Sequence, residues 1–135
     1  MRHLLLIAAL ACPLVATAER TYIQEFYDAR RIEKADPAAA IEGMRRSFEK
    51  AIAEGNADYA TAAGASACHL IYQQGKNVEA GKFARDVIGE LDAFPVDGPH
   101  GDAVRRCSIF GYLERGLIME GKIGPALQAN RAGAA

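Results

Sequence analysis

The stretch from Asp58 to Leu91 constrains the fold most, because apolar residues recur there at steps of three and four on both sides of a polar turn, Gln73–Asn77. That spacing places them on one face of a helix. A turn of five residues makes two helices lie antiparallel, so the stretch predicts a helical hairpin. Its apolar positions are Tyr59, Ala60, Ala63, Gly64, Ala67, Cys68, Leu70 and Ile71, then Ala80, Phe83, Val87, Leu91 and Phe94.

The apolar face of the first helix in this hairpin is made of small residues. Ala60, Gly64 and Cys68 follow one another at steps of four, so a neighbouring helix can approach closely. A glycine inside a helix costs about 1 kcal/mol relative to alanine, and close packing is the reason we expect for Gly64. Gly75 is placed to end this helix in a left-handed conformation, and Asn77 to cap the next helix.

The whole composition predicts an all-α protein. Half of the residues are hydrophobic, tryptophan is absent, and no segment alternates with a period of two. Further helices are expected over residues 20–34, 36–54, 102–119 and 125–135, with Asp36 as a cap, Pro37 and Pro125 as first helical residues, and Asn56 capping the hairpin. Two prolines and two glycines make the segment from Pro95 to Gly101 a loop.

The first 18 residues have the pattern of a secretory signal peptide. Arg2 begins a short basic start, Leu4–Ala11 is apolar, and Ala16-Thr17-Ala18 is a small-x-small cleavage site. The apolar run is too short to span a membrane. We therefore expect cleavage after Ala18, a helical-repeat domain over residues 19–135, and export to the periplasm or out of a bacterial cell. The competing interpretation is lipidation at Cys12, in a segment similar to a bacterial lipobox.

Three turns of the chain can be superposed. The segments 34–40, 74–80 and 120–126 end in matched alanines, Ala40, Ala80 and Ala126, which lie 40 and then 46 residues apart. A helical pair that recurs in this way is typical of an α-solenoid.

These residues resemble the tetratricopeptide repeat family. The resemblance runs from Asp36 onward and rests on Gln74-Gly75 followed by Glu79-Ala80, a pattern repeated by Gly121 and Ala126. It implies antiparallel hairpins stacked as a short right-handed α-solenoid, with a concave groove lined by the first helix of each pair. The implied groove residues are Tyr59, His69, Tyr72, Arg105, Tyr112 and Arg115.

Cys68 and Cys107 are the cysteines that remain after signal cleavage, and an exported pair is a candidate disulfide. Cys68 lies seven residues before Gly75, and Cys107 lies fourteen before Gly121. In helices aligned side by side this offset is about 10 Å along the axis, whereas a bridge needs Cα atoms within about 7 Å. Both a disulfide and two buried thiols therefore remain open.

Catalytic motifs are absent from the sequence, which favours a protein that is not an enzyme and needs no cofactor. Residues 19–135 carry 15 basic and 17 acidic groups without a basic stripe, and this excludes nucleic acid as an expected partner. Asp97, His100 and Asp102 could hold a cation, although such loops are usually solvated turns.

These observations predict a scaffold that binds a protein or peptide by burying an apolar or acidic segment in its groove. Two alternatives remain. One is a small helical bundle that binds a lipid or another apolar ligand in its core, and the other is an enzyme whose site has no recognisable motif.

Overall fold

A computed structural model describes residues 19–94 and 101–135, and over these residues the chain is entirely helical apart from turns. The prediction of an all-α protein is confirmed. The elements are α1 (Tyr22–Ile32), α2 (Pro37–Ala53), α3 (Ala57–Gln73), α4 (Asn77–Leu91), α5 (Gly101–Met119) and α6 (Ile123–Ala134). The predicted signal peptide, the cleavage site at Ala18 and the alternative lipid site at Cys12 lie outside the described residues, as do residues 95–100.

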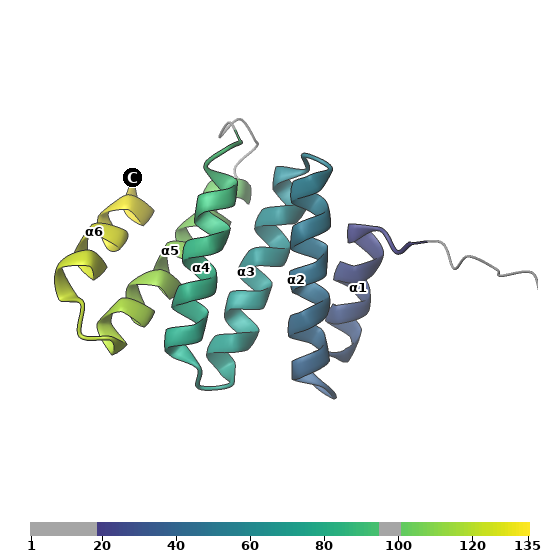
Figure 1. Cartoon of the computed structure of the whole chain (residues 1–135), viewed down its shortest axis with the longest axis horizontal. Coiled ribbons are helices and arrows are strands. Elements are labelled where there is room, and N and C mark those ends of the chain that lie inside the picture. The colour runs from purple at the N-terminus through teal and green to yellow at the C-terminus, as the bar shows by residue number, and fades with distance from the viewer. Residues whose placement is uncertain (1–18, 95–100) are drawn as a thin grey trace, which may run out of the picture.

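The helices follow one another in a row, and each packs against the next (Figure 1). Helix α3 also packs against α5, and to a smaller extent against α1. Helices α1, α3 and α5 therefore form one layer, while α2 and α4 cover it from the other side. The row begins at α1 and ends at α6, which packs on α5.

Glycines in the left-handed conformation lie in three of the turns between consecutive helices, as predicted for Gly75. Gly55, Gly75 and Gly121 have φ of 73°, 75° and 75°. In each case the next residue donates its backbone N–H to a carbonyl five positions back, as Lys76 does to Ile71. This bond ends one helix and makes the residue after the glycine the N-cap of the next.

The same turn geometry explains two predictions that were wrong. Asn77 is the first residue of α4 and not its cap, because Lys76 occupies the cap position without a side-chain hydrogen bond. Helix α6 begins at Ile123, so Pro125 is its third residue. Asp36 and Asn56 do cap α2 and α3 through side-chain oxygens, as predicted.

Helix α1 is shorter than expected and begins with a capping box. The side chain of Thr21 accepts a hydrogen bond from the backbone N–H of Gln24, and the side chain of Gln24 accepts one from the backbone of Thr21. These two bonds satisfy donors that the first helical turn cannot pair, so the helix starts at Tyr22 and not at Arg20.

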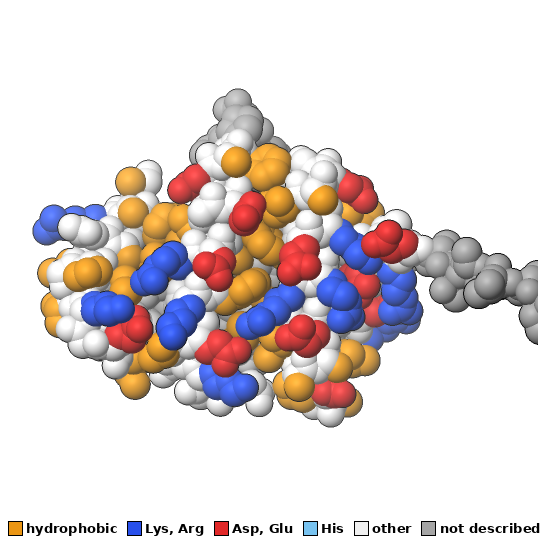
Figure 2. All heavy atoms as spheres, in the orientation of Figure 1, with side chains coloured by type: hydrophobic (Ala, Val, Ile, Leu, Met, Phe, Trp, Pro, Cys, Tyr) orange, Lys and Arg blue, Asp and Glu red, His pale blue; other side chains and the backbone are white. Residues whose placement is uncertain are grey.

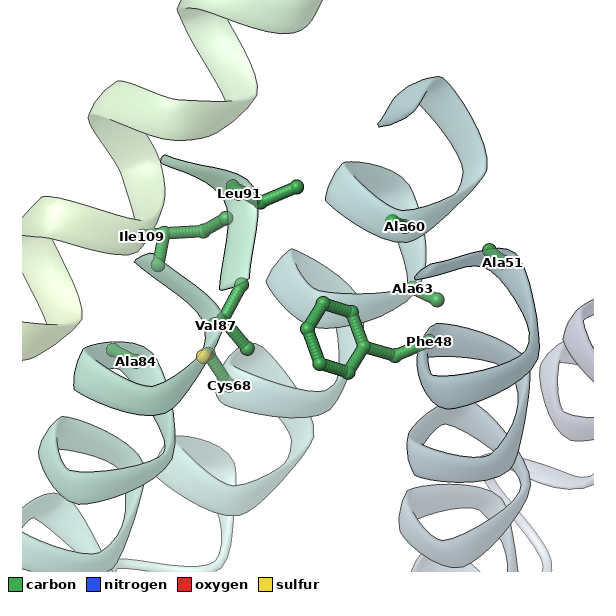
Figure 3. Close-up of a cluster of buried hydrophobic side chains, with 9 residues drawn as sticks. All are labelled: Phe48, Ala51, Ala60, Ala63, Cys68, Ala84, Val87, Leu91 and Ile109. Atoms are coloured by element: carbon green, nitrogen blue, oxygen red, sulfur yellow. The ribbon is translucent and has the colours of Figure 1, made fainter. Parts of the chain in front are cut away.

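Small residues allow the helices to approach closely, as the sequence predicted for Gly64. A Cβ atom added to Gly64 would lie 2.7 Å from Cγ1 of Val87 on α4. At the crossing of α4 and α5, a Cβ atom on Gly81 would lie 2.8 Å from Cα of Gly116. The main core packs side chains of α2, α3, α4 and α5 together (Figure 3): Phe48, Ala51, Ala60, Ala63, Cys68, Ala84, Val87, Leu91 and Ile109.

A buried carboxylate joins α1 to α2. Glu25 is 5% exposed, and its Oε2 accepts hydrogen bonds from Nε and Nη2 of Arg46 at 3.2 and 3.1 Å. Nζ of Lys50 lies 3.4 Å from Oε1 of the same side chain. Burial raises the pKa of Glu25, but the hydrogen bonds and charges of Arg46 and Lys50 outweigh it, and the net shift is downward.

None of the helices over residues 19–94 and 101–135 is long and apolar enough to cross a membrane.

Candidate functional site

An open groove of about 900 Å³ runs across α1, α3 and α5. These are the helices of one layer, so the groove lies on the face that α2 and α4 do not cover. Its lining is Phe26, Tyr27, Arg30, Glu33, Lys34, Pro37, Ala62, Ala65, Ser66, His69, Leu70, Gln73, Gln74, Arg105, Ser108 and Tyr112.

Helix α3 forms the floor of the groove with small residues. Ala62, Ser66, His69 and Gln73 are spaced by three or four and therefore share one face of the helix. The short side chains at the first two positions leave room between the flanking helices. His69 is the first large side chain along this face.

The walls of the groove come from α1 and α5. Phe26 and Arg30 from α1 stand on one side. Arg105, Ser108 and Tyr112 from α5 stand on the other, again at steps of three and four. The periodicity that makes each helix amphipathic therefore gives each one a row of groove residues.

A cluster of aromatic and basic side chains borders the groove where α3 meets α5. Nδ1 of His69 and the hydroxyl of Tyr112 share a hydrogen bond of 2.8 Å. The rings of Tyr72 and Tyr112 have centroids 5.7 Å apart, and the guanidinium of Arg115 lies 5.1 Å from the Tyr72 ring and 5.8 Å from the Tyr112 ring. Burial is the main cause that raises the pKa of Tyr112, so its hydroxyl stays protonated and available for hydrogen bonding.

Tyr59 lies near the start of α3, against aromatic residues of α1. Its ring centroid is 5.2 Å from that of Tyr22 and 5.9 Å from that of Phe26. A hydrogen bond with Tyr27, together with burial, raises the pKa of Tyr59. These contacts fasten α1 to α3 beside the groove.

Three of the six residues that the resemblance placed in a groove line this one, namely His69, Arg105 and Tyr112. Tyr72 and Arg115 extend the aromatic cluster next to it, and Tyr59 packs against α1.

The wall formed by α1 was missed. The resemblance begins at Asp36, so it does not predict that residues 22–32 are the first helix of a pair, although they directly precede the matched turn 34–40. Tyr27 could have signalled this wall, because a large aromatic side chain stands on the partly exposed side of a short helix.

The groove carries more positive than negative charge. Three of its lining residues are basic and one is acidic: Arg30, Lys34 and Arg105 against Glu33. Arg30 pairs with Glu33 at 3.2 Å. Lys34 and Arg105 form no ion pair with a carboxylate of the described residues, so their charge is available to a ligand.

The opposite face has a different electrostatic character. Figure 2 shows acidic and basic side chains interspersed over α2 and α4. Arg45 of α2 lies 3.4 Å from Glu79 of α4 and 3.9 Å from Glu42 of its own helix. Neighbouring charges on this face therefore compensate one another.

Cys68 and Cys107 are free thiols, and the candidate bridge between them is not formed in the structure. Cys68 belongs to the core beside Val87, and burial raises its pKa to about 12. Cys107 is exposed on α5 and donates its thiol hydrogen to the backbone carbonyl of Gly133 on α6. The alternative of two buried thiols is therefore right for Cys68 and wrong for Cys107. Cys107 lies on the side of α5 that meets α6, and this short helix does not cover the thiol.

Within residues 19–94 and 101–135, no three histidine, cysteine or acidic side chains lie close enough together to hold a metal ion. The weak candidate formed by Asp97, His100 and Asp102 lies outside the described side chains.

Comparison with known proteins found no matching family model, no matching curated protein and no matching solved structure. The resemblance to tetratricopeptide repeats therefore stays a prediction.

Proposed function

We propose that this chain is a peptide-binding helical-repeat protein that holds an acidic, partly apolar polypeptide segment in the groove of α1, α3 and α5. In this proposal the pairs α1–α2, α3–α4 and α5–α6 are three units of a short right-handed solenoid of the tetratricopeptide type. The protein acts after export, in the periplasm or outside the cell, once residues 1–18 have been removed.

The groove is the observation that carries this proposal. It combines aromatic surface from Phe26, Tyr27 and Tyr112 with the charges of Lys34 and Arg105, which have no carboxylate partner among the described residues. Aromatic side chains supply contact area, and basic groups attract carboxylates and fix their register. An extended segment that bears both acidic and apolar side chains matches this lining.

The order of the helices supports the solenoid part of the proposal. The matched alanines Ala40, Ala80 and Ala126 are all buried, each in the first turn of the second helix of a pair. The alternative of a lipid in the core has less support. The cavity beside Leu91 and Ile109 has a volume of about 20 Å³, which is room for one water molecule.

The test is fluorescence anisotropy with a labelled peptide that contains glutamates and leucines, compared with the same peptide carrying lysines for the glutamates. We expect the acidic peptide to bind and Arg105→Glu to weaken its binding at least about tenfold, because the variant places like charges face to face. Arg85→Glu is the matched control, since Arg85 is exposed on α4, away from the groove.

Equal binding of the two peptides would show that the groove charge does not select its ligand. An equal loss of affinity in Arg85→Glu would show that net charge is responsible and not the groove. Either result contradicts the proposal.

A further inference from the structure

The two basic side chains of the groove that have no carboxylate partner among the described residues stand on opposite walls. Lys34 lies in the turn that follows α1, and Arg105 lies on α5. Both residues are exposed. Glu33, the acidic residue of the lining, is paired with Arg30 at 3.2 Å, so its charge is already compensated.

Lys34 marks one end of the groove. Each helix packs antiparallel on the next, so α1, α3 and α5 run in the same direction (Figure 1). Lys34 and Gln74 hold equivalent positions in the matched turns after α1 and α3, and both line the groove. Lys34 therefore stands at the level of the end of α3.

Arg105 marks the other end. The hydrogen bond between the hydroxyl of Tyr112 and Nδ1 of His69 places these two residues at the same level of α5 and α3. Arg105 precedes Tyr112 by seven residues, so it stands at the level of Ala62, which also lines the groove. Ala62 and Gln74 are twelve residues apart along α3. At 1.5 Å per residue, the two cations are therefore separated by about 18 Å along the groove.

The floor between these ends favours an extended ligand. The side chains of Ser66, Gln73 and Gln74 line the groove and make no hydrogen bond to the described residues. An extended chain offers unpaired backbone N–H and C=O groups to such side chains, whereas a helix has already paired its own. Successive side chains of an extended chain point to opposite sides, so in this groove they alternate between the walls of α1 and α5.

We propose that the groove holds its ligand extended along α3, with two acidic side chains five positions apart, one bound by Arg105 and the other by Lys34. Five residues at about 3.3 Å each span about 17 Å, which matches the separation of the two cations. An odd spacing also directs the two carboxylates to opposite walls, where the two cations stand. Apolar side chains between them lie against Phe26 and Tyr112. This register rests on the proposed function, since it assigns a conformation and a spacing to the same acidic segment.

The test is fluorescence anisotropy of the full chain with two labelled peptides of identical composition. One peptide has two glutamates five positions apart with leucines between them, and the other has the glutamates two positions apart. We expect the first peptide to bind at least about fivefold more tightly, because the second cannot reach both cations at once.

Charge reversal identifies which carboxylate meets which cation. Arg105→Glu and Lys34→Glu should each weaken binding of the first peptide at least about tenfold. A lysine in place of one glutamate of the peptide should restore the affinity of one variant, and a lysine in place of the other glutamate should restore that of the other variant. Lys82→Glu is the matched control, because Lys82 is exposed on α4, away from the groove. Circular dichroism should match the parent for all three variants, since all three positions are exposed.

Three results would overturn this register and leave the proposed function standing. The first is equal affinity for the two peptides. The second is restoration of both variants by the same substituted peptide, because a single carboxylate would then meet both cations. The third is a larger loss of affinity in Arg115→Gln than in Lys34→Gln, since the segment would then lie along α5 alone. If neither acidic peptide binds, the proposed function fails and the register fails with it.

Discussion

Gly81→Ala tests whether the crossing of α4 and α5 depends on the absence of side chains. The added Cβ would lie 2.8 Å from Cα of Gly116, whereas carbon atoms in favourable contact are about 3.5–4.0 Å apart. The obstacle is backbone and cannot rotate away, so the two helices must separate by several tenths of an ångström. Overpacking of this kind costs about 1–3 kcal/mol.

Helix propensity opposes this cost. Alanine is about 1 kcal/mol more favourable than glycine within a helix. We therefore expect Gly81→Ala to lower the free energy of unfolding by up to about 2 kcal/mol. Gly111→Ala is the control, because Gly111 lies within α5 and a Cβ there meets nothing within 4 Å. It should raise the free energy of unfolding by about 0.5–1 kcal/mol.

The assay is urea denaturation of both variants and of the parent, followed by circular dichroism. Gly116→Ala should resemble Gly81→Ala, and the double variant should cost less than the sum of the two, because one separation of the helices accommodates both methyl groups. A Gly81→Ala variant as stable as Gly111→Ala would refute the reasoning, since propensity alone would then account for both.

Three further predictions concern single side chains. Glu25→Gln should lower the free energy of unfolding by about 1–3 kcal/mol, measured by urea denaturation, because it leaves Arg46 and Lys50 without their buried carboxylate. Since the folded-state pKa of Glu25 is lowered, its contribution to stability is complete above the ordinary carboxyl pKa of 4.5 and is lost as the pH falls through the folded-state value. The melting temperature of the parent should therefore decrease more steeply with falling pH than that of Glu25→Gln. Parallel decreases in the two proteins would contradict a lowered pKa of Glu25 in the folded state. Iodoacetamide labelling mapped by mass spectrometry should modify Cys107 in the folded protein but Cys68 only after denaturation, because Cys68 is buried and its pKa is raised to about 12. Asn56→Ala should cost about 1 kcal/mol of stability, because the N-cap bond to the backbone N–H of Tyr59 is lost, and an unchanged denaturation midpoint would show that water replaces this cap without cost.

Local patterns in the sequence were sufficient to predict the helices and most of their boundaries. Apolar residues at steps of three and four and glycines at the turns act over a few neighbouring residues, so they can be read without knowledge of the fold. Gly64 was correctly assigned to a close approach of helices for the same reason. Asn77 was misjudged as a cap because the turn bond from Lys76 to Ile71 determines the cap position, and capping preference alone does not.

By contrast, the groove, the ion pairs of Glu25 and the burial or exposure of Cys68 and Cys107 depend on packing between segments that are distant in the sequence. Glu25 and Arg46 are 21 residues apart, and His69 and Tyr112 are 43 apart. No local pattern indicates that either pair will meet. Cys68 and Cys107 occupy similar faces of α3 and α5, yet α4 buries Cys68 whereas α6 leaves Cys107 exposed. A helix therefore carries its amphipathic pattern in its own sequence, whereas the use of each face depends on which helices the tertiary structure brings against it.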